Sequence, residues 1–315
     1  MKLLAAAFAA ALLALPAAAQ AVERGTMIQR SYTNAAGTRT YHLYVPPGGA
    51  TTKPLMVWLH GCGGPLTMAA GHALAKVADE DDFILAYPVQ DAAANAAQCW
   101  NWFVDGQIHR GQGEASIIAG ITTSLMSEFS DAATLAIDPA RVYLGGYSAG
   151  GAMTTVMGAT YPDLYAAISP QAGSPYDFDP GEKAYAEMGP RARPMPAYFV
   201  QSVADEISNY GIGRVNLLQW LRTDDLADDG TANSSVATTP DSAEPTMFNT
   251  SFGPLPMTVE HYAPGPCELA EFVTSPLEHL ATGYLVSEDA GLDLQRAMMR
   301  FLLAHRLGGP GHACA

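Results

Sequence analysis

The chain has 315 residues, and its 31 acidic residues outnumber its 16 basic ones, which gives a net charge of −15 at pH 7. This balance argues against nucleic acid, anionic membrane surfaces and polyanionic substrates as partners, and it favours a neutral substrate. The length suits one large α/β domain whose core needs no stabilising metal or disulfide.

The first 21 residues have the pattern of a secretory signal peptide. Lys2 precedes the apolar run 3–15, and Ala19-Gln20-Ala21 then offers small residues at a cleavage site. The run is too short to be a permanent membrane helix, so we expect no membrane anchor. We therefore predict a secreted protein, extracellular or periplasmic, with residues 22–315 forming a single catalytic domain.

From residue 41 onward, patterns typical of strands and of helices alternate. We expect strands over 41–45, 55–59, 83–87, 141–144, 166–169, 198–201, 257–262 and 271–274, the first of them at a sheet edge. We expect helices over 68–78, 114–129, from 149 onward, 214–221 and 292–305. This alternation predicts an α/β fold with a mainly parallel central sheet and helices on both faces.

Two segments lack this periodicity. Residues 181–196 contain three prolines, and we expect a surface loop there. Residues 223–245 are rich in Asp, Ser, Thr, Ala and Gly. Because too little chain follows for a second domain, we interpret this segment as a long excursion or lid within the one domain.

The most informative motif is Gly146-Tyr147-Ser148-Ala149-Gly150, between an expected strand and an expected helix. This is the context of a nucleophile elbow, in which a serine occupies a tight turn and small neighbours let strand and helix approach. The following helix presents N–H groups to developing negative charge. The motif predicts an α/β-hydrolase fold with Ser148 as the nucleophile.

A second motif, His60-Gly61-Cys62-Gly63-Gly64, follows the expected strand 55–59. Its position suits the loop that completes an oxyanion hole. We expect the main-chain N–H groups of Cys62 and Ala149 to be the donors. His60 is interpreted as a structural hydrogen-bonding residue.

Chain order in this fold places an acid and then a histidine after the nucleophile. Asp205 follows the expected strand 198–201; Glu206 is its nearest rival, and the alternative is a carboxylate that caps the next helix. Of the later histidines, His279 follows a strand by a short loop, whereas His261 lies within one. The sequence predicts a Ser148–His279–Asp205 triad that needs no metal and no organic cofactor.

The chain has four cysteines, at positions 62, 99, 267 and 314. An even number in an exported protein predicts two disulfides, and the sequence itself leaves three pairings open. The spacing lacks the close pairs of a zinc site.

Taken together, these motifs resemble the secreted polyhydroxybutyrate depolymerase and esterase family. The likeness rests on five segments: 60–62, Cys-Trp-Asn-Trp-Phe at 99–103, Arg-Gly-Gln-Gly-Glu at 110–114, 146–153 and 171–176. The resemblance implies a Cys62–Cys99 disulfide, which leaves Cys267 to pair with Cys314. It also suggests aromatic residues lining an acyl pocket, with Trp102 and Tyr147 as candidate substrate-binding residues. Core packing is the alternative for Trp102, and it is favoured for Trp100.

The expected activity is hydrolysis of poly- or oligo(3-hydroxybutyrate)-type polyesters through an acyl-enzyme. Rival activities are those of a feruloyl or acetylxylan esterase and of an oxidised poly(vinyl alcohol) hydrolase. A non-enzyme alternative is a catalytically silent binding protein with the hydrolase fold. Two departures weaken the polymer assignment. Glu278 and Leu280-Ala281 flank His279 where the family often has Gly and Ala-Trp. Many polymer depolymerases also append a separate substrate-binding domain, for which we expect no room in this chain.

Overall fold

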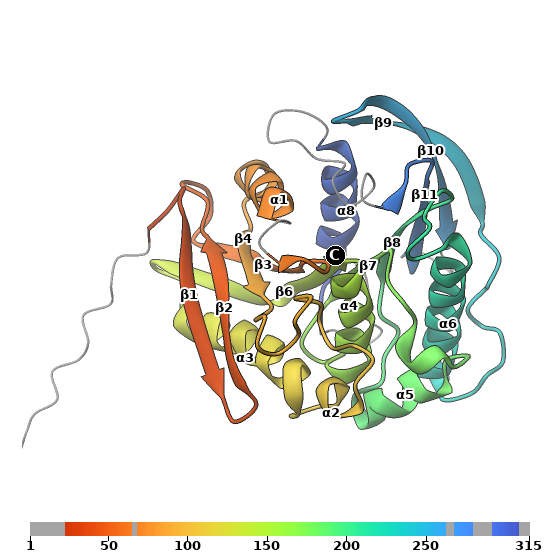
Figure 1. The fold of residues 1–315 in the computed structure, drawn as a ribbon, viewed down its shortest axis with the longest axis horizontal. Helices are drawn as coiled ribbons and strands as arrows, with labels where there is room; N and C mark the ends of the chain where they lie inside the picture. Colours follow the sequence, from red (N-terminus) through yellow and green to blue (C-terminus); the bar gives the residue numbers. More distant parts are fainter. Residues whose placement is uncertain (1–22, 65–67, 263–267, 280–291, 309–315) are drawn as a thin grey trace, which may run out of the picture.

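A computed structural model of the chain describes residues 23–64, 68–262, 268–279 and 292–308 (Figure 1). The predicted signal peptide, Cys267 and Cys314 lie outside the described residues, so the cleavage site and the second disulfide stay predictions. No helix in the described ranges combines the length and the apolar character needed to cross a membrane.

An eleven-stranded sheet runs through the described structure, and its main path has the order β1-β2-β4-β3-β6-β7-β8-β11-β10-β9. The strands are β1 (Met27–Asn34), β2 (Gly37–Tyr44), β3 (Thr52–Leu59), β4 (Ile84–Val89), β5 (Ser130–Asp131), β6 (Leu135–Tyr147), β7 (Ala167–Gln171), β8 (Ala197–Ser202), β9 (Ser242–Thr250), β10 (Gly253–Tyr262) and β11 (Ala270–Ser275). From β4 to β11 along this path neighbouring strands are parallel, and antiparallel strands extend both ends. This is the predicted sheet of an α/β-hydrolase fold.

Helices cover both faces of the sheet (Figure 1). They are α1 (Met68–Asp81), α2 (Asp105–Ile108), α3 (Gly113–Glu128), α4 (Ala149–Thr160), α5 (Glu182–Met188), α6 (Tyr210–Asp229) and α8 (Asp293–Leu303), with the 3₁₀ turns η2 (Tyr176–Phe178) and η3 (Gly189–Arg191). Helices α1 and α8 lie on one face, and α3, α4 and α6 lie on the other.

The central strand β3 illustrates why this sheet is buried on both sides. Leu55, Val57 and Leu59 pack into the core beneath α3 and α4, whereas Met56 and Trp58 pack into the core beneath α1 and α8. A strand that is covered on both faces has a continuous apolar sequence, and this is the pattern by which it was predicted.

The structure corrects the prediction that the strand at 41–45 lies at the sheet edge. It is β2, and β1 pairs with it on the outside. No strand was predicted at β1, because its apolar residues are few and none of its side chains is fully buried.

The prediction of a surface loop over 181–196 is also wrong, because this segment contains α5 and η3. Ala184 and Met188 of α5 are buried in the core. The prolines that suggested a loop come only after this helix has ended.

The predicted excursion over 223–245 is shorter than expected. Helix α6 continues to Asp229, and β9 starts at Ser242. Between them, the carboxylate of Asp225 accepts the N–H groups of Ser234 and Val236, each over 3.0 Å. The connecting segment therefore folds back onto the helix.

Candidate active site

Ser148 lies in the sharp turn between β6 and α4. Its φ of 57° and ψ of −119° belong to a backbone region that residues other than glycine rarely adopt. The two glycines of the motif allow the turn to be this tight. A Cβ atom on Gly146 would lie 2.5 Å from the carbonyl oxygen of Gly150, and one on Gly150 would lie 2.1 Å from that of Leu59. The motif thus forms the predicted strand–turn–helix arrangement.

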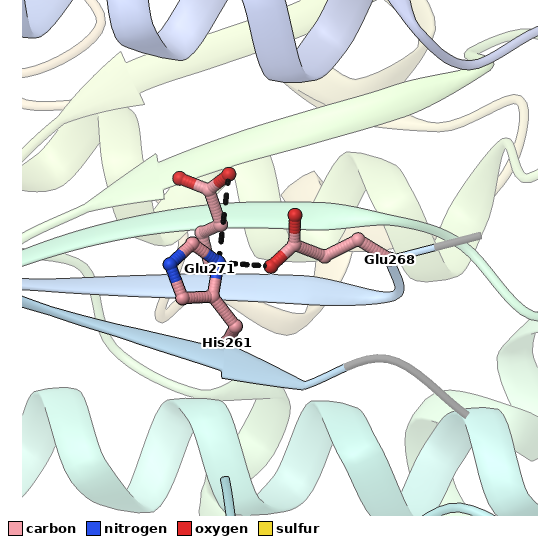
Figure 2. A group of neighbouring side chains, drawn as sticks. All are labelled: His261, Glu268 and Glu271. Atoms are coloured by element: carbon pink, nitrogen blue, oxygen red, sulfur yellow. Dashed lines mark hydrogen bonds and ion pairs between the residues drawn. The ribbon is translucent and has the colours of Figure 1, made fainter. Parts of the chain in front are cut away.

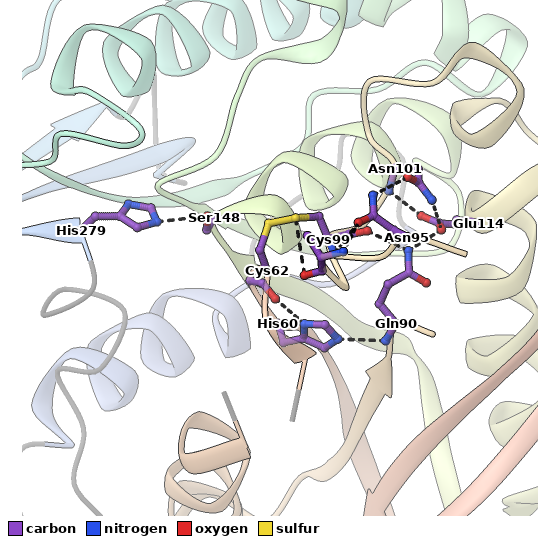
Figure 3. Close-up of a disulfide and its surroundings, with 11 residues drawn as sticks. His60, Cys62, Gln90, Asn95, Cys99, Asn101, Glu114, Ser148 and His279 are labelled. Carbon is purple, nitrogen blue, oxygen red and sulfur yellow. Dashed lines mark hydrogen bonds between the residues drawn. A yellow bond between two sulfur atoms is a disulfide. The ribbon is translucent and has the colours of Figure 1, made fainter. Parts of the chain in front are cut away.

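The structure brings the three predicted triad residues together. His279 Nε2 lies 3.1 Å from Ser148 Oγ (Figure 3), and His279 Nδ1 lies 2.5 Å from Asp205 Oδ2. The side chain of Asp205 is fully buried and that of His279 is 6% exposed. Since the Asp205 carboxylate accepts a hydrogen bond, Nδ1 carries the proton and Nε2 is left to accept from the Ser148 hydroxyl.

The sheet itself places the predicted acid and the predicted base side by side. Strands β8 and β11 are parallel neighbours, with Ser202 opposite Ser275 in the register. Asp205 and His279 follow these strand ends by three and four residues, so both emerge at the same edge of the sheet. This edge, at the carboxyl ends of the strands, is where ligand sites of α/β sheets form.

Main-chain donors fix the Asp205 carboxylate. Its Oδ1 atom accepts the N–H groups of Ile207 over 2.9 Å and Ser208 over 2.7 Å, which leaves Oδ2 for His279. The alternative role of a helix cap belongs to Asn209, whose side chain accepts the Ile212 N–H at the start of α6. The rival acid Glu206 is exposed.

His261, the alternative base, lies on β10 and has acidic partners of its own (Figure 2). Its Nδ1 atom is 2.5 Å from Glu268 and 4.0 Å from Glu271. Burial and the charge of Glu268 raise the pKa of Glu271 to about 8. These three residues hold their ligand atoms within 4.8 Å of one another, a grouping that could take a metal ion. The Ser148–His279–Asp205 chain includes none of them.

His60 has a structural place in the molecule. Its Nε2 accepts the main-chain N–H of Gln90 over 2.9 Å, so Nδ1 carries the proton and donates to the Gly61 carbonyl over 2.5 Å (Figure 3). Burial lowers the pKa of His60, which keeps the ring neutral. This geometry agrees with the interpretation of His60 as a hydrogen-bonding residue that holds the following loop.

The loop after β3 passes directly over Ser148, the predicted nucleophile. A Cβ atom on Gly61 would lie 3.3 Å from Ser148 Cβ. A disulfide joins the next residue, Cys62, to Cys99, as the resemblance implied (Figure 3). Ala149 is the first residue of α4, where main-chain N–H groups lack partners within the helix. Both predicted oxyanion donors are therefore on segments that adjoin Ser148.

A buried carboxylate, Glu114, supports the segment that carries Cys99. It accepts the Asn101 main-chain N–H over 2.7 Å, the Asn101 side-chain amide over 2.7 Å and the Gln90 side-chain amide over 2.5 Å. Arg39 donates to the same carboxylate over 3.0 Å. The segment 110–114 was part of the resemblance to the family, but no role was predicted for Glu114.

Tyr147 contacts the predicted base. Its hydroxyl donates to the His279 carbonyl over 2.5 Å, and the two ring centroids are 5.1 Å apart. This contact helps to hold His279, and the role of Tyr147 in substrate binding stays a prediction.

The two tryptophans of the Cys-Trp-Asn-Trp-Phe segment differ in their surroundings. Trp100 is fully buried and packs 5.5 Å from the His60 ring, as expected for core packing. Trp102 is half-buried and lines a pocket of about 400 Å³ whose lining residues include none of the triad.

Comparison with known sequences finds one matching family, described as Esterase PHB depolymerase, over residues 39–217. Poly(3-hydroxyalkanoate) depolymerase C of Paucimonas lemoignei is 33% identical over 64% of this chain and 47% of that protein. Acetylxylan esterase A of Talaromyces purpureogenus is 33% identical over 44% of this chain and 35% of its own length. Feruloyl esterase B of Neurospora crassa is 34% identical over 45% and 46%. The chain spans less than half the length of these relatives.

Solved structures share the fold at low sequence identity. An acetyl xylan esterase from Aspergillus awamori superimposes with a TM-score of 0.66 at 17% identity, covering 87% of this chain and 98% of that one. An S-formylglutathione hydrolase from Staphylococcus aureus gives 0.53 at 11% identity, covering 88% and 98%. These likenesses confirm the predicted fold class.

Proposed function

The chain belongs to the Esterase PHB depolymerase family, and on that basis we propose that it is a secreted serine carboxylic ester hydrolase with Ser148 as its nucleophile. The observation that carries the proposal is the continuous chain from Ser148 Oγ through His279 to the buried Asp205 carboxylate. Nucleophile, base and orienting acid at these distances are the arrangement that activates a serine hydroxyl.

In the proposed reaction, Ser148 Oγ attacks the ester carbonyl while His279 Nε2 takes its proton. Asp205 holds the imidazole in the required tautomer and stabilises its charged form. The N–H groups of Cys62 and Ala149 stabilise the oxyanion. His279 then returns the proton to the leaving alcohol, and water hydrolyses the acyl-enzyme by the same steps.

The proposed substrate is a poly- or oligo(3-hydroxybutyrate)-type polyester, with the catalytic domain formed by residues 22–315. The depolymerase of P. lemoignei supports this choice. A second candidate is an acetyl or feruloyl ester on a plant polysaccharide, which the acetylxylan and feruloyl esterase relatives support to the same degree.

The test uses purified residues 22–315 and a Ser148→Ala variant on four substrates in parallel: amorphous poly(3-hydroxybutyrate) granules, acetylated xylan, methyl ferulate and p-nitrophenyl acetate. We expect hydrolysis of p-nitrophenyl acetate and at least a ~10³-fold loss of kcat in the variant. Clearing of the granules with release of hydroxybutyrate supports the polyester. Release of acetate from xylan or of ferulate, without clearing, selects the polysaccharide ester. A wild-type protein that is inactive on all four substrates refutes the enzyme assignment.

A further inference from the structure

A pocket of about 400 Å³ lies apart from the triad, between the segment that leads into α2 and the segment formed by η2 and α5. Four aromatic side chains line it: Trp102, Phe103, Tyr176 and Phe178. The buried residue Ile108 also lines it. The triad and the predicted oxyanion donors include none of these residues, and only Trp102 among them was a candidate for binding the ester.

The aromatic side chains form a cluster centred on Trp102, with the planes of Phe103 and Phe178 inclined at 82° and 53° to the Trp102 ring. The Trp102 ring is 5.4 Å from Phe103 and 6.3 Å from Phe178, measured between centroids. Phe103 is 62% exposed and Phe178 is 59% exposed, so neither serves the core. A gathering of exposed aromatic residues beside a pocket marks a binding surface. The negatively charged face of such rings attracts weakly positive C–H groups, which a sugar ring presents on its flat side.

The hydrogen-bonding groups of the pocket are mainly acceptors. Three carboxylates line it, from Asp105, Asp177 and Glu187. Several of the donors nearby bond to these carboxylates. His109 bonds to Glu187 over 2.9 Å and to Asp105 over 3.1 Å, and those bonds raise the pKa of His109.

Two further side chains of the pocket also donate to its carboxylates. Lys183 is bonded to Asp177, and the Tyr176 hydroxyl donates to Glu187 over 3.3 Å. An ionised carboxylate has about four lone-pair positions, and Asp105 and Asp177 are both exposed at the pocket. The pocket therefore offers a ligand more acceptors than donors, the donors being the further N–H groups of the Lys183 ammonium and the indole N–H of Trp102.

These features select among neutral ligands. An aliphatic polyester has only acceptors, its carbonyl and ester oxygens, so it could use the Lys183 and Trp102 donors and none of the three carboxylates. An anionic ligand is repelled by the three carboxylates. A sugar ring has hydroxyl groups that both donate and accept around an apolar face, and it matches the carboxylates, the few donors and the aromatic cluster. We propose that this pocket binds a neutral sugar ring of a polysaccharide, at a site separate from the catalytic serine.

The binding site stands without the esterase activity. A further step rests on the proposed function. If the chain both binds a polysaccharide and hydrolyses esters, an acetyl or feruloyl ester on that polysaccharide is favoured as the substrate over the polyester.

The test titrates xylotetraose, cellotetraose and a linear trimer of 3-hydroxybutyrate into the Ser148→Ala protein by calorimetry, so that binding is measured without turnover. We expect saturable binding of a sugar tetramer and none of the trimer. The double change Phe103→Ala, Phe178→Ala should weaken sugar binding at least about tenfold, because each aromatic contact is worth roughly 1 kcal/mol and about 1.4 kcal/mol is a factor of ten.

Phe252→Ala is the matched control, since Phe252 is also an exposed phenylalanine, 57% accessible, and does not line the pocket. It should bind the sugar like the parent protein. Absence of saturable binding of both tetramers overturns the proposal, as does binding that the double change leaves intact. Tight binding of the hydroxybutyrate trimer that the double change abolishes assigns the pocket to polyester instead. Esterase activity is measured separately on the wild type, so its failure is not confused with failure of the binding site.

Discussion

The main-chain N–H of Gln90 donates to His60 Nε2 over 2.9 Å, at the point where β4 ends beside the loop that follows β3. The side chain of Gln90 donates onward to the buried Glu114. These two bonds connect the loop over Ser148 to the same carboxylate that binds Asn101 (Figure 3). The Cys62–Cys99 disulfide links the same loop to the segment before Asn101.

Glu114→Gln should destabilise the protein by about 3 kcal/mol, because it leaves the buried Arg39 guanidinium without its counter-charge. Glu128→Gln is the matched control: Glu128 also pairs with an arginine, Arg30, but is 42% exposed, and less than about 1 kcal/mol is expected. Urea unfolding of both variants measures the difference. Equal losses would contradict a supporting role for the buried carboxylate.

Replacing Cys62 and Cys99 together by serine should lower the free energy of unfolding by about 4 kcal/mol, since the bond closes a loop of 37 residues in the unfolded chain. It should also lower kcat, because Cys62 lies in the loop over Ser148. Peptide mapping without reduction should find the two cysteines linked. A reduced wild type that unfolds at the same urea concentration as the oxidised protein would count against this contribution.

His279→Ala should remove at least ~10³-fold of kcat on p-nitrophenyl acetate, as expected for loss of the base. His261→Ala should keep most of the activity, because His261 bonds to Glu268 on the hairpin of β10 and β11. The reverse pattern would assign the base to His261. Circular dichroism of both variants checks that each is folded.

Tyr147→Phe separates two roles for this residue. Loss of the hydrogen bond to the His279 carbonyl should cost about 1 kcal/mol of positioning, which is a roughly fivefold fall in kcat with little change in KM. A substrate-binding residue would instead show its effect in KM. Steady-state kinetics over a range of ester concentrations distinguishes the two.

Glu271 should contribute a loss of stability as the pH rises from about 4.5 to about 8. Burial and the charge of Glu268 raise the pKa of Glu271 to about 8 in the folded state, so between these values the folded protein holds a proton that the unfolded chain has released. The contribution is fully present below pH 4.5 and is lost as the pH passes through about 8. In urea titrations at a series of pH values, Glu271→Gln should make the slope of the free energy of unfolding against pH shallower. The exposed Glu182→Gln should leave it unchanged, and an unaltered slope in the Glu271 variant would disprove the assignment.

Much of the fold could be predicted because the central strands are covered on both faces. Their apolar runs stand out from the surrounding sequence, and the predicted positions of the acid and the base follow from the strand ends that precede them. Asp205 and His279 were predicted in this way, each just beyond a buried strand. The outer strand β1 gave no such pattern, because one of its faces is open to solvent.

The supporting residues could not be found by the same reasoning, because their partners are distant in the chain. Glu114 meets Gln90 at a separation of 24 residues and Arg39 at 75. A lone Glu in a glycine-rich segment carries no local sign of these contacts. The contact of Tyr147 with His279 spans 132 residues and likewise depends on the parallel order of the strands.

The backbone conformation of Ser148 lowers the stability of the folded protein at the residue proposed to be the nucleophile. Its φ of 57° costs a serine of the order of 1–3 kcal/mol, whereas glycine adopts such angles freely and loses only about 0.5–1 kcal/mol to its greater freedom when unfolded. A Ser148→Gly protein would thus be at least as stable as the native protein, but it would have no hydroxyl to attack an ester. Selection of variants for heat resistance alone would favour this loss, and only selection for turnover keeps the serine in its strained turn.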